Sequence, residues 1–405
     1  MTASRPLRAA VIGTGFVGRQ HVDAIRRVGD AEVAVVAAST VVKATDAAAA
    51  LHVAAGSGDW AAVVADPAID VVHVCVPNDL HLPVARAALE AGKHVVSEKP
   101  LALNTAEGRQ LVALAAASDR VAVLCHNYRF YALVAELRWR IANGELGRLH
   151  AVRGSYLQDW LIAASDTNWR VDERRGGPSR VIADIGTHWI DLAETVTGRQ
   201  LEAVFATVDT VHPRRPATSG AETFSGGSDA VAAAPRDGGW RDVRTEDQAA
   251  ILLRFAGGLS GSLVVSQVAA GHDNGLKLSV DGSDASATWQ QESPDRLWLG
   301  RRDGRVETVA RNAARLSPPA RELVRLPPGH PEGWADAFRN LVAAAYGEMR
   351  GTTRAADSMP LPTFPDGLRH LAFVEAALES AATERWVSVA ATTAAPDAKA
   401  VRAMP

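Results

Sequence analysis

The sequence has few cysteines, few aromatic side chains and no long apolar run, and each shortage narrows the class of protein. Its two cysteines, Cys75 and Cys125, both lie in short apolar runs, which is typical of buried strands in a reducing compartment. No apolar run is long enough to span a bilayer, and the first residues lack the core of a signal peptide. We therefore expect a cytoplasmic protein without a membrane partner.

The chain also lacks an excess of either charge. Its 43 Lys and Arg residues nearly balance 46 Asp and Glu residues, which gives a formal net charge of −3. Nucleic-acid-binding surfaces need clustered positive charge, so the composition gives no reason to expect a DNA or RNA partner. Hydrophobic residues make up 47% of the 405 positions, as in soluble globular proteins, and this length predicts two domains.

Residues 1–128 alternate short Val-rich runs with segments of helical periodicity. Five runs predict strands buried on both faces: LRAAVIG, AEVAVVAAS, DVVHVCVP, KHVVSEKP and RVAVLCHN. This alternation is typical of a parallel sheet with right-handed helical crossovers. We therefore expect an α/β fold whose N-terminal domain, residues 1–128, is a Rossmann-type doubly wound parallel sheet.

Residues 129–390 have a different pattern, with helices followed by several strand-like runs. Gly257-Gly258 separates two of these runs and predicts a hairpin. We expect an α+β domain with a large, mostly antiparallel sheet that forms a homodimer or homotetramer through its uncovered face. Residues 213–239 and the tail, 391–405, lack periodicity, so we expect a mobile insertion and a flexible end. Two late helices are predicted, one with a stripe from Trp334 to Ala345 and one over 367–382.

The motif GTGFVG, residues 13–18, directly follows the first predicted strand and opens the first predicted helix. Gly13 permits a tight turn, Gly15 lets the backbone approach a pyrophosphate, and Gly18 lets the helix pack on the strand. The phosphate would then meet the helix N-terminus. A purely structural glycine turn is the alternative, but the place of the motif in a βαβ chain favours a dinucleotide site.

The second predicted strand ends in AVVAAST, without an acidic residue. An NAD-binding domain usually has Asp or Glu there, which accepts a hydrogen bond from the ribose 2′-hydroxyl. Ser39, Thr40 and Lys43 instead leave room and positive charge for a 2′-phosphate, which favours NADP over NAD. A solvated Lys43 with two uninvolved hydroxyls is the alternative, so NADP and NAD both stay open.

Two further patterns carry chemistry. VVSEKPLALN, residues 95–104, places Lys99 between an acid and a proline at the end of an apolar run. Proline restricts the residue before it, so we expect Lys99 in a fixed loop at a strand end, where ligands of parallel sheets bind. ADIGTHWID places Asp184 and His188 four residues apart, on one face of a helix. A capping aspartate and a core histidine are the alternative. No His/Cys cluster has zinc spacing, so no metal is expected.

The order GTGFVG, VPNDLH, EKPL, NYRF and NWR…ADIGTH resembles the glucose–fructose oxidoreductase/inositol dehydrogenase (Gfo/Idh/MocA) family of NAD(P)-dependent oxidoreductases, over nearly the whole chain. The resemblance implies that Lys99, Asp184 and His188 are catalytic. The expected cofactor-binding residues are Gly13, Gly15, Phe16, Val17, Gly18, Ser39, Thr40, Lys43, Pro77, Asn78, His81, Glu98, Lys99, Asn127 and Arg170. The expected substrate-binding residues are Lys99, Asn127, Tyr156, Asp184 and His188.

RGSYLQDW also resembles a subgroup that oxidises sugars and anhydrosugars such as levoglucosan. The chain departs from the family at two places: the acidic ribose ligand is missing, and Pro178 stands where the family often has a further glycine. The first departure leaves the cofactor preference open, and the second predicts an altered substrate loop.

We therefore expect hydride transfer between a nicotinamide and a carbinol carbon of a sugar, anhydrosugar, glycoside or inositol-type polyol. His188 would accept the hydroxyl proton, Asp184 would orient the imidazole, and Lys99 would stabilise the developing alkoxide. One alternative is a non-catalytic regulator that senses dinucleotide or sugar, although such a protein should lack one of these three residues. Another is a family member that uses a transient ketosugar for reduction or elimination.

Overall fold

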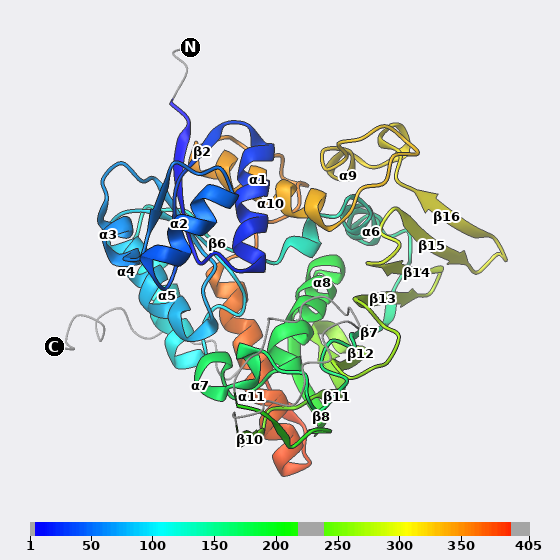
Figure 1. The fold of residues 1–405 in the computed structure, drawn as a ribbon. Helices are drawn as coiled ribbons and strands as arrows, with labels where there is room; N and C mark the ends of the chain where they lie inside the picture. Colours follow the sequence, from blue (N-terminus) through cyan, green and yellow to red (C-terminus); the bar gives the residue numbers. More distant parts are fainter. Residues whose placement is uncertain (1–4, 218–238, 390–405) are drawn as a thin grey trace. The chain divides into compact units, whose positions relative to one another are not determined.

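The computed structural model describes residues 5–217 and 239–389, which form two compact units (Figure 1). Of the described residues, the first unit contains 5–130 and 334–368, and the second contains 131–217, 239–333 and 369–389. No helix in these described ranges combines the length and the apolar character needed to cross a bilayer. The expected flexible tail, 391–405, lies outside the described residues.

The first unit is built on a wholly parallel sheet of six strands in the order β3-β2-β1-β4-β5-β6. Its strands are β1 (Leu7–Ile12), β2 (Ala31–Ala37), β3 (Ala55–Ser57), β4 (Val71–Val74), β5 (His94–Ser97) and β6 (Ala122–Leu124). This is the strand order of a dinucleotide-binding Rossmann domain, in which ligands bind at the carboxyl ends of the strands where the order reverses. The predicted fold of this unit is confirmed. The sequence pattern missed β3 because Ala-Gly-Ser has no Val-rich run.

Helices alternate with these strands along the chain, as the sequence pattern predicted. They are α1 (Phe16–Val28), α2 (Val41–Ala50), α3 (Trp60–Ala65), α4 (His81–Glu90) and α5 (Thr105–Ala117), with short turns η1 (Asn78–Leu80) and η2 (Asn127–Phe130). Gly92 follows α4 with φ of 69°, a conformation that glycine adopts without strain.

Helix α10 (Trp334–Met349) belongs to the first unit, although the sequence placed it in a C-terminal domain that is continuous over 129–390. Its predicted apolar stripe is half-buried at Trp334 and buried from Phe338 to Ala345. Phe338 packs edge-to-face on His21 of α1 with ring centroids 4.8 Å apart. Tyr346 lies 5.8 Å from the ring of His73 on β4. The helix returns to the first sheet because its stripe matches this surface. A linear scan of the chain cannot detect such a match.

The second unit is built on a nine-stranded sheet in the order β16-β15-β14-β13-β7-β12-β11-β8-β17, in which only the β7–β12 pair is parallel. The strands are β7 (Leu149–Leu157), β8 (Leu201–Asp209), β11 (Gln248–Phe255), β12 (Leu259–Ser266), β13 (Gly275–Gly282), β14 (Ala285–Gln290), β15 (Arg296–Arg301), β16 (Val306–Ala310) and β17 (Val387–Ser388). Gly257 and Gly258 connect β11 to β12 with φ of 75° and 77°, as the predicted hairpin requires. The large, mostly antiparallel sheet is confirmed.

The helices of the second unit are α6 (Ala132–Ala142), α7 (Glu173–Gly176), α8 (Thr187–Thr197) and α9 (Pro318–Arg321), with short turns η3 (Trp169–Val171), η5 (Ala256–Gly258) and η6 (Ala313–Arg315). The boundary between the units at 368/369 falls within α11 (Phe364–Thr383). The segment Ile182–Gly186, labelled η4, is a π-helical turn that leads into α8. The sequence predicted an ordinary helix from about residue 184. Wide turns of this kind are rare and often mark functional sites.

The expected mobile insertion at 213–239 has a different extent in the structure. Its first residues form β9 (Arg214–Pro216), which pairs antiparallel with β10 (Trp240–Asp242) directly after the predicted insertion, and Arg215 is fully buried. Its central part, 218–238, lies outside the described residues. The first residue of the irregular segment was therefore predicted too early. Arg215 is buried and donates to residues far away in the chain, which fixes residues 214–216 although their composition is typical of a loop.

Candidate active site

The glycines of GTGFVG form a turn between β1 and α1. Gly13 has φ of 106°, and a Cβ there would lie 2.2 Å from the carbonyl oxygen of Cys75. A Cβ on Gly18 would lie 2.0 Å from the carbonyl oxygen of Gly13, so neither position accepts a side chain. Gly15 is the N-cap of α1 and offers no capping side chain, and a Cβ on it would enter open space. The first N–H groups of α1 have no partner within the helix, and the open space beside Gly15, the candidate pyrophosphate cradle, leaves room for an anion there.

Phe16 and Val17 are the first residues of α1. The Phe16 side chain is 49% exposed, and its ring centroid lies 6.2 Å from that of Trp334 on α10. At the end of β2, Ser39, Thr40 and Lys43 are exposed. Thr40 caps α2, with its hydroxyl oxygen accepting from the backbone N–H of Lys43 at 3.2 Å.

The VPNDLH segment forms a turn after β4. Pro77 precedes η1, and Asn78 is buried within it. The ring of His81 lies between two carbonyl oxygens, with Nδ1 2.7 Å from that of Pro100 and Nε2 2.9 Å from that of Val76. Burial lowers the pKa of His81, although both carbonyls favour the protonated ring. Since both ring nitrogens are engaged by backbone, His81 connects the turn after β4 to the turn after β5.

Lys99 follows the carboxyl end of β5, and the Lys99–Pro100 peptide is cis. Glu98 is buried, with one carboxylate oxygen 3.3 Å from the Lys99 backbone nitrogen and the other 3.2 Å from Nε2 of His21. Burial alone would raise the pKa of Glu98, but the hydrogen bond from His21 and the positive charge of Lys99 bring it below its ordinary value. Both carboxylate oxygens of Glu98 are therefore held by protein groups, directly before Lys99 in the chain.

A chain of buried polar side chains continues from Glu98, and the sequence gave no sign of it. Nδ1 of His21 lies 2.7 Å from Nδ1 of His73, and Nε2 of His73 lies 2.8 Å from the Tyr346 hydroxyl. Only one assignment of neutral rings gives each contact one donor: Tyr346 donates to His73, His73 to His21, and His21 to Glu98. Burial and the nearby His21 hold the pKa of His73 well below its ordinary value, as a neutral chain requires.

The ligand atoms of His21, Glu98 and Cys125 lie within 4.8 Å of one another. Their positions on α1, after β5 and after β6 give no metal-site spacing in the sequence. Burial raises the pKa of Cys125 well above its ordinary value, which disfavours the thiolate that binds metals.

Asn127, in η2, is 2% exposed, and its Nδ2 has no hydrogen-bond partner within 5–217 and 239–389. A buried amide donor of this kind fits a residue that contacts a ligand.

In the second unit, Asp184 lies in the π-helical turn and His188 in the first turn of α8. One oxygen of the Asp184 carboxylate accepts from Nε of Arg170 at 3.2 Å, and the other accepts from Nε2 of Gln267 at 2.9 Å. The structure therefore brings Arg170 and Asp184 together. Gln267 was missed, because nothing in the run GLSGSLVVSQV distinguishes its last polar residue from a surface glutamine.

His188 is buried, and its ring centroid lies 6.3 Å from that of Tyr156. The Tyr156 hydroxyl donates to Oδ1 of Asn274 at 2.7 Å, and Nε2 of Gln158 donates to the same oxygen at 2.8 Å. Gly154, on β7, lets α8 approach that strand, because a Cβ at this position would lie 2.4 Å from the indole nitrogen of Trp189 on α8. Polar groups therefore gather where β7 ends and β13 begins.

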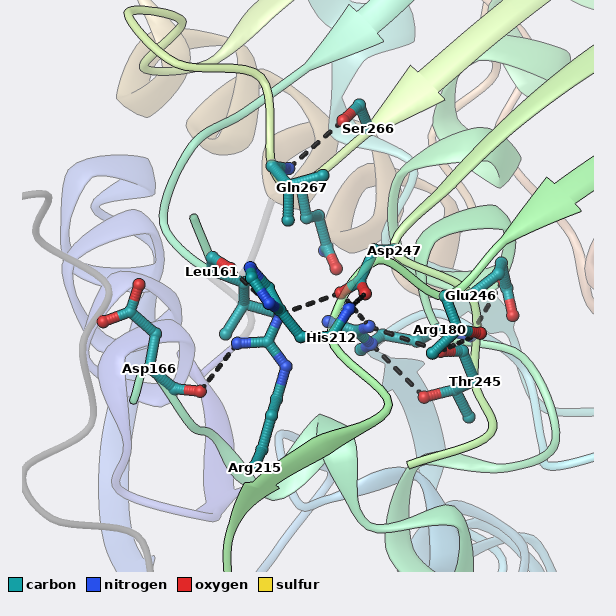
Figure 2. A network of polar contacts seen from close by, with 12 residues as sticks. Leu161, Asp166, Arg180, His212, Arg215, Thr245, Glu246, Asp247, Ser266 and Gln267 are labelled. Atoms are coloured by element: carbon teal, nitrogen blue, oxygen red, sulfur yellow. Dashed lines mark hydrogen bonds and ion pairs between the residues drawn. The ribbon is translucent and has the colours of Figure 1, made fainter. Parts of the chain in front are cut away.

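A buried charged network lies at the same end of the sheet (Figure 2). Asp247, just before β11, binds the guanidinium groups of Arg180 and Arg215, and all three side chains are fully buried. Burial alone would raise the pKa of Asp247, but the charge of Arg180 brings it below its ordinary value. Arg215 also donates to the backbone carbonyls of Leu161 and Asp166 at 2.9 and 2.8 Å.

Glu246, beside Asp247, caps the turn that carries Asp184. One of its oxygens accepts from the Ser179 hydroxyl at 2.6 Å and from the backbone N–H groups of Arg180 and Ile182, both at 3.0 Å. The turn has no capping side chain of its own. Burial raises the pKa of Glu246 against the opposing effect of the Ser179 hydrogen bond. Glu246 and Asp247 thus hold the start of this helical segment from a different part of the chain.

Comparisons with known proteins agree with this architecture. A model of an oxidoreductase family with an NAD-binding Rossmann fold matches residues 7–126, and a GFO/IDH/MocA C-terminal domain model matches residues 134–288. The levoglucosan dehydrogenase of Pseudarthrobacter phenanthrenivorans is 30% identical over 407 residues, covering 95% of this chain and 98% of that protein.

Two solved structures extend the likeness to three dimensions. A levoglucosan dehydrogenase in complex with NADH matches with a TM-score of 0.84 at 28% identity, over 95% of this chain and 99% of that chain. An inositol dehydrogenase homolog complexed with NAD+ from Azotobacter vinelandii matches with a TM-score of 0.81 at 28% identity, over 96% and 98% of the two chains. The chain therefore belongs to the Gfo/Idh/MocA family of oxidoreductases.

Proposed function

We propose that the chain is an NAD(P)-dependent dehydrogenase that oxidises a carbinol carbon of a sugar, anhydrosugar, glycoside or inositol-type polyol. The observation that carries the proposal is the Asp184 carboxylate, held on both oxygens just before the helix that carries His188. Alcohol oxidation needs a positioned base, because the hydroxyl proton must leave as the carbonyl forms. The names of the relatives, a levoglucosan dehydrogenase and an inositol dehydrogenase homolog, support this substrate class.

The nicotinamide, when bound, supplies the hydride chemistry, and the residues of the chain supply the rest. We assign proton transfer to His188, because an imidazole with an ordinary pKa of about 6.5 can take a proton near neutral pH. We assign to Asp184 the orientation of the imidazole and the stabilisation of its charged form. We assign to Lys99 the stabilisation of negative charge on the substrate oxygen, since an ammonium group at the end of a strand can be aimed by the backbone.

The polar groups beside His188 support a hydroxyl-rich substrate. Tyr156, Gln158 and Asn274 form a connected hydroxyl–amide cluster in the second unit. Amides and hydroxyls donate as well as accept, so they can match several hydroxyls of a sugar or polyol. An apolar alcohol would leave such groups unpaired, at a cost in affinity.

For the cofactor we propose NADP ahead of NAD, because Ser39, Thr40 and Lys43 follow β2 without an intervening carboxylate. The NADH complex of the related dehydrogenase supports the alternative, NAD. Lys43→Ala should weaken NADP binding by about 10- to 100-fold, since it removes a charged contact to the 2′-phosphate, and should leave NAD binding nearly unchanged. Fluorescence titration with both dinucleotides measures this, and an unchanged NADP dissociation constant would exclude the contact.

The activity is tested by screening the purified chain with NAD and NADP against sugars, anhydrosugars and inositols. On the best substrate, His188→Ala should lower kcat by about 100-fold or more with dinucleotide affinity retained. The rate of oxidation should rise with pH through the pKa of the base, and the variant should lose that dependence. A His188→Ala protein that keeps most of the wild-type rate would refute the assignment. Dinucleotide binding without turnover on any substrate would favour the regulator.

For the assembly we propose a homodimer or homotetramer formed by a second copy on the nine-stranded sheet. Leu252 and Val264, on the adjacent strands β11 and β12, are 52% and 47% exposed, while Ile251, Leu253 and Val265 beside them are buried. One face of these strands therefore carries solvent-exposed apolar side chains, which favours association. The molar mass of the purified chain by light scattering tests this, and a monomer at micromolar concentration would contradict it.

A further inference from the structure

The donors to the Asp184 carboxylate include two of different kinds. Arg170 donates from η3, and its guanidinium also lies over the ring of Trp169, 4.3 Å from the ring centroid. Gln267 donates from the residue after β12, as a neutral amide. Arg170 and Gln267 thus donate to different oxygens of the carboxylate, which fixes the plane of the group as well as its place.

The orientation of the Gln267 amide follows from its partner. An ionised carboxylate only accepts hydrogen bonds, so the amide nitrogen must face Asp184. The Gln267 side chain is fully buried, and its Oε1 has no partner in the described part of the chain. A half-satisfied buried amide costs stability relative to an apolar residue of similar size. Its one described side-chain hydrogen bond, to Asp184, accounts for its presence.

The backbone of Gln267 is fixed on both sides. Its N–H donates to the carbonyl of Asp247 at 3.0 Å, and its carbonyl accepts from the N–H of Leu161 at 3.1 Å. Asp247 is in turn fixed by Arg180 and Arg215 (Figure 2). Since Arg215 also binds the Leu161 carbonyl, both backbone neighbours of Gln267 are tied to one buried ionic cluster.

We propose that Gln267 is a positioning residue for Asp184, and that the Arg180–Asp247–Arg215 cluster sets the place from which its amide donates. The proposal rests on the proposed function, in which Asp184 orients the proton-accepting histidine. Gln267 does not itself act on substrate. It keeps the carboxylate ionised and correctly turned, because a donor to the charged form stabilises that form.

Two substitutions distinguish a role of Gln267 in positioning Asp184 from a role in filling the core. Gln267→Glu keeps the size of the side chain but places a carboxyl group beside Asp184. Two carboxyl groups so close share a proton, and while they do, the introduced group can donate to Asp184 as the amide does. At higher pH the proton is lost and two negative charges face each other. Gln267→Leu removes the donor at every pH.

We expect the kcat of Gln267→Glu, relative to wild type, to fall by about tenfold or more between about pH 6 and about pH 9. Gln267→Leu should lower kcat by a pH-independent factor of about 10 to 100. The dissociation constant for the dinucleotide should stay within about twofold in both variants. Gln248→Glu is the matched control. Gln248 lies at the same end of the sheet, and its side-chain amide donates to a different carboxylate, that of Asp209, at 3.1 Å. Its kcat relative to wild type should be independent of pH.

If Gln267→Glu keeps the wild-type kcat, and the ratio of the two kcat values does not change with pH, the proposal is overturned. Equal pH-dependent losses in the Gln248→Glu control would also overturn it. If Gln267→Leu does not fold, the near-isosteric glutamate variant still decides the matter. A wild-type protein that oxidises no sugar or polyol with either dinucleotide counts against the proposed function. Turnover by wild type with unaffected Gln267 variants counts against the positioning role alone.

Discussion

The two units stabilise buried polar residues at their candidate sites in different ways. In the first unit, Tyr346, His73 and His21 form a chain of neutral donors that ends on one carboxylate, Glu98. In the second, two arginines and Asp247 form a compact cluster of full charges with no exposure. A neutral chain loses one hydrogen bond when it is cut, whereas the charged cluster loses the carboxylate that both guanidinium groups share. The second arrangement should therefore respond far more strongly to a single substitution.

The largest effect is expected from Asp247→Asn. The amide cannot neutralise Arg180 and Arg215, so two buried guanidinium groups lose their counter-charge, and the free energy of unfolding should fall by about 3–5 kcal/mol. Asp281→Asn is the matched control, because Asp281 pairs with Arg153, whose side chain is 56% exposed. That change should cost at most about 1 kcal/mol. Chemical denaturation of the full chain measures both, and equal losses would contradict the contrast.

A smaller effect, on binding rather than folding, is expected from Gly15→Ala. Its φ of −66° suits alanine and a Cβ there meets no protein atom, so the melting temperature should be unchanged. The methyl group would occupy the cradle at the N-terminus of α1, and dinucleotide affinity should fall by about tenfold or more.

Gly13→Ala provides the contrast for that experiment. Its Cβ would collide with the backbone of Cys75, so the melting temperature itself should fall. Calorimetry and a dinucleotide titration of both variants decide the point. If Gly15→Ala binds dinucleotide as wild type does, the pyrophosphate does not lie in this cradle.

The smallest effect is expected from the pH dependence of the neutral chain. Because the pKa of His73 is well below its ordinary value in the folded protein, unfolding takes up a proton below about pH 6.5, and stability falls as the pH is lowered. His73→Gln removes this proton uptake. The slope of unfolding free energy against pH, between about pH 6.5 and 5, should decrease by about 1.4 kcal/mol per pH unit.

His150→Gln is the control for the slope, since His150 is exposed on β7 and should leave it unchanged. Urea denaturation at several pH values measures the slopes. A His73→Gln protein with the wild-type slope would mean that His73 is protonated in the folded state or that the chain of neutral rings is assigned wrongly.

The sequence by itself determined the repeating units of the first sheet, the glycine turn after β1 and the lysine after β5. These features depend on neighbours in the chain: an apolar run sets a strand, a glycine permits the turn, and a proline restricts Lys99. The spacing of Asp184 and His188 was visible for the same reason. The hairpin at Gly257-Gly258 also follows from local backbone freedom alone.

Only the tertiary structure decided which distant residues support these features. Gln267 lies 83 positions from Asp184, and Asp247 lies 32 positions from Arg215. No local pattern marks such pairs, because a buried hydrogen bond is selected by the geometry of packed elements and not by spacing along the chain. The return of α10 to the first unit and the burial of Arg215 have the same cause. Burial makes a charged or polar side chain depend on a specific partner, and the fold alone determines which partner is within reach.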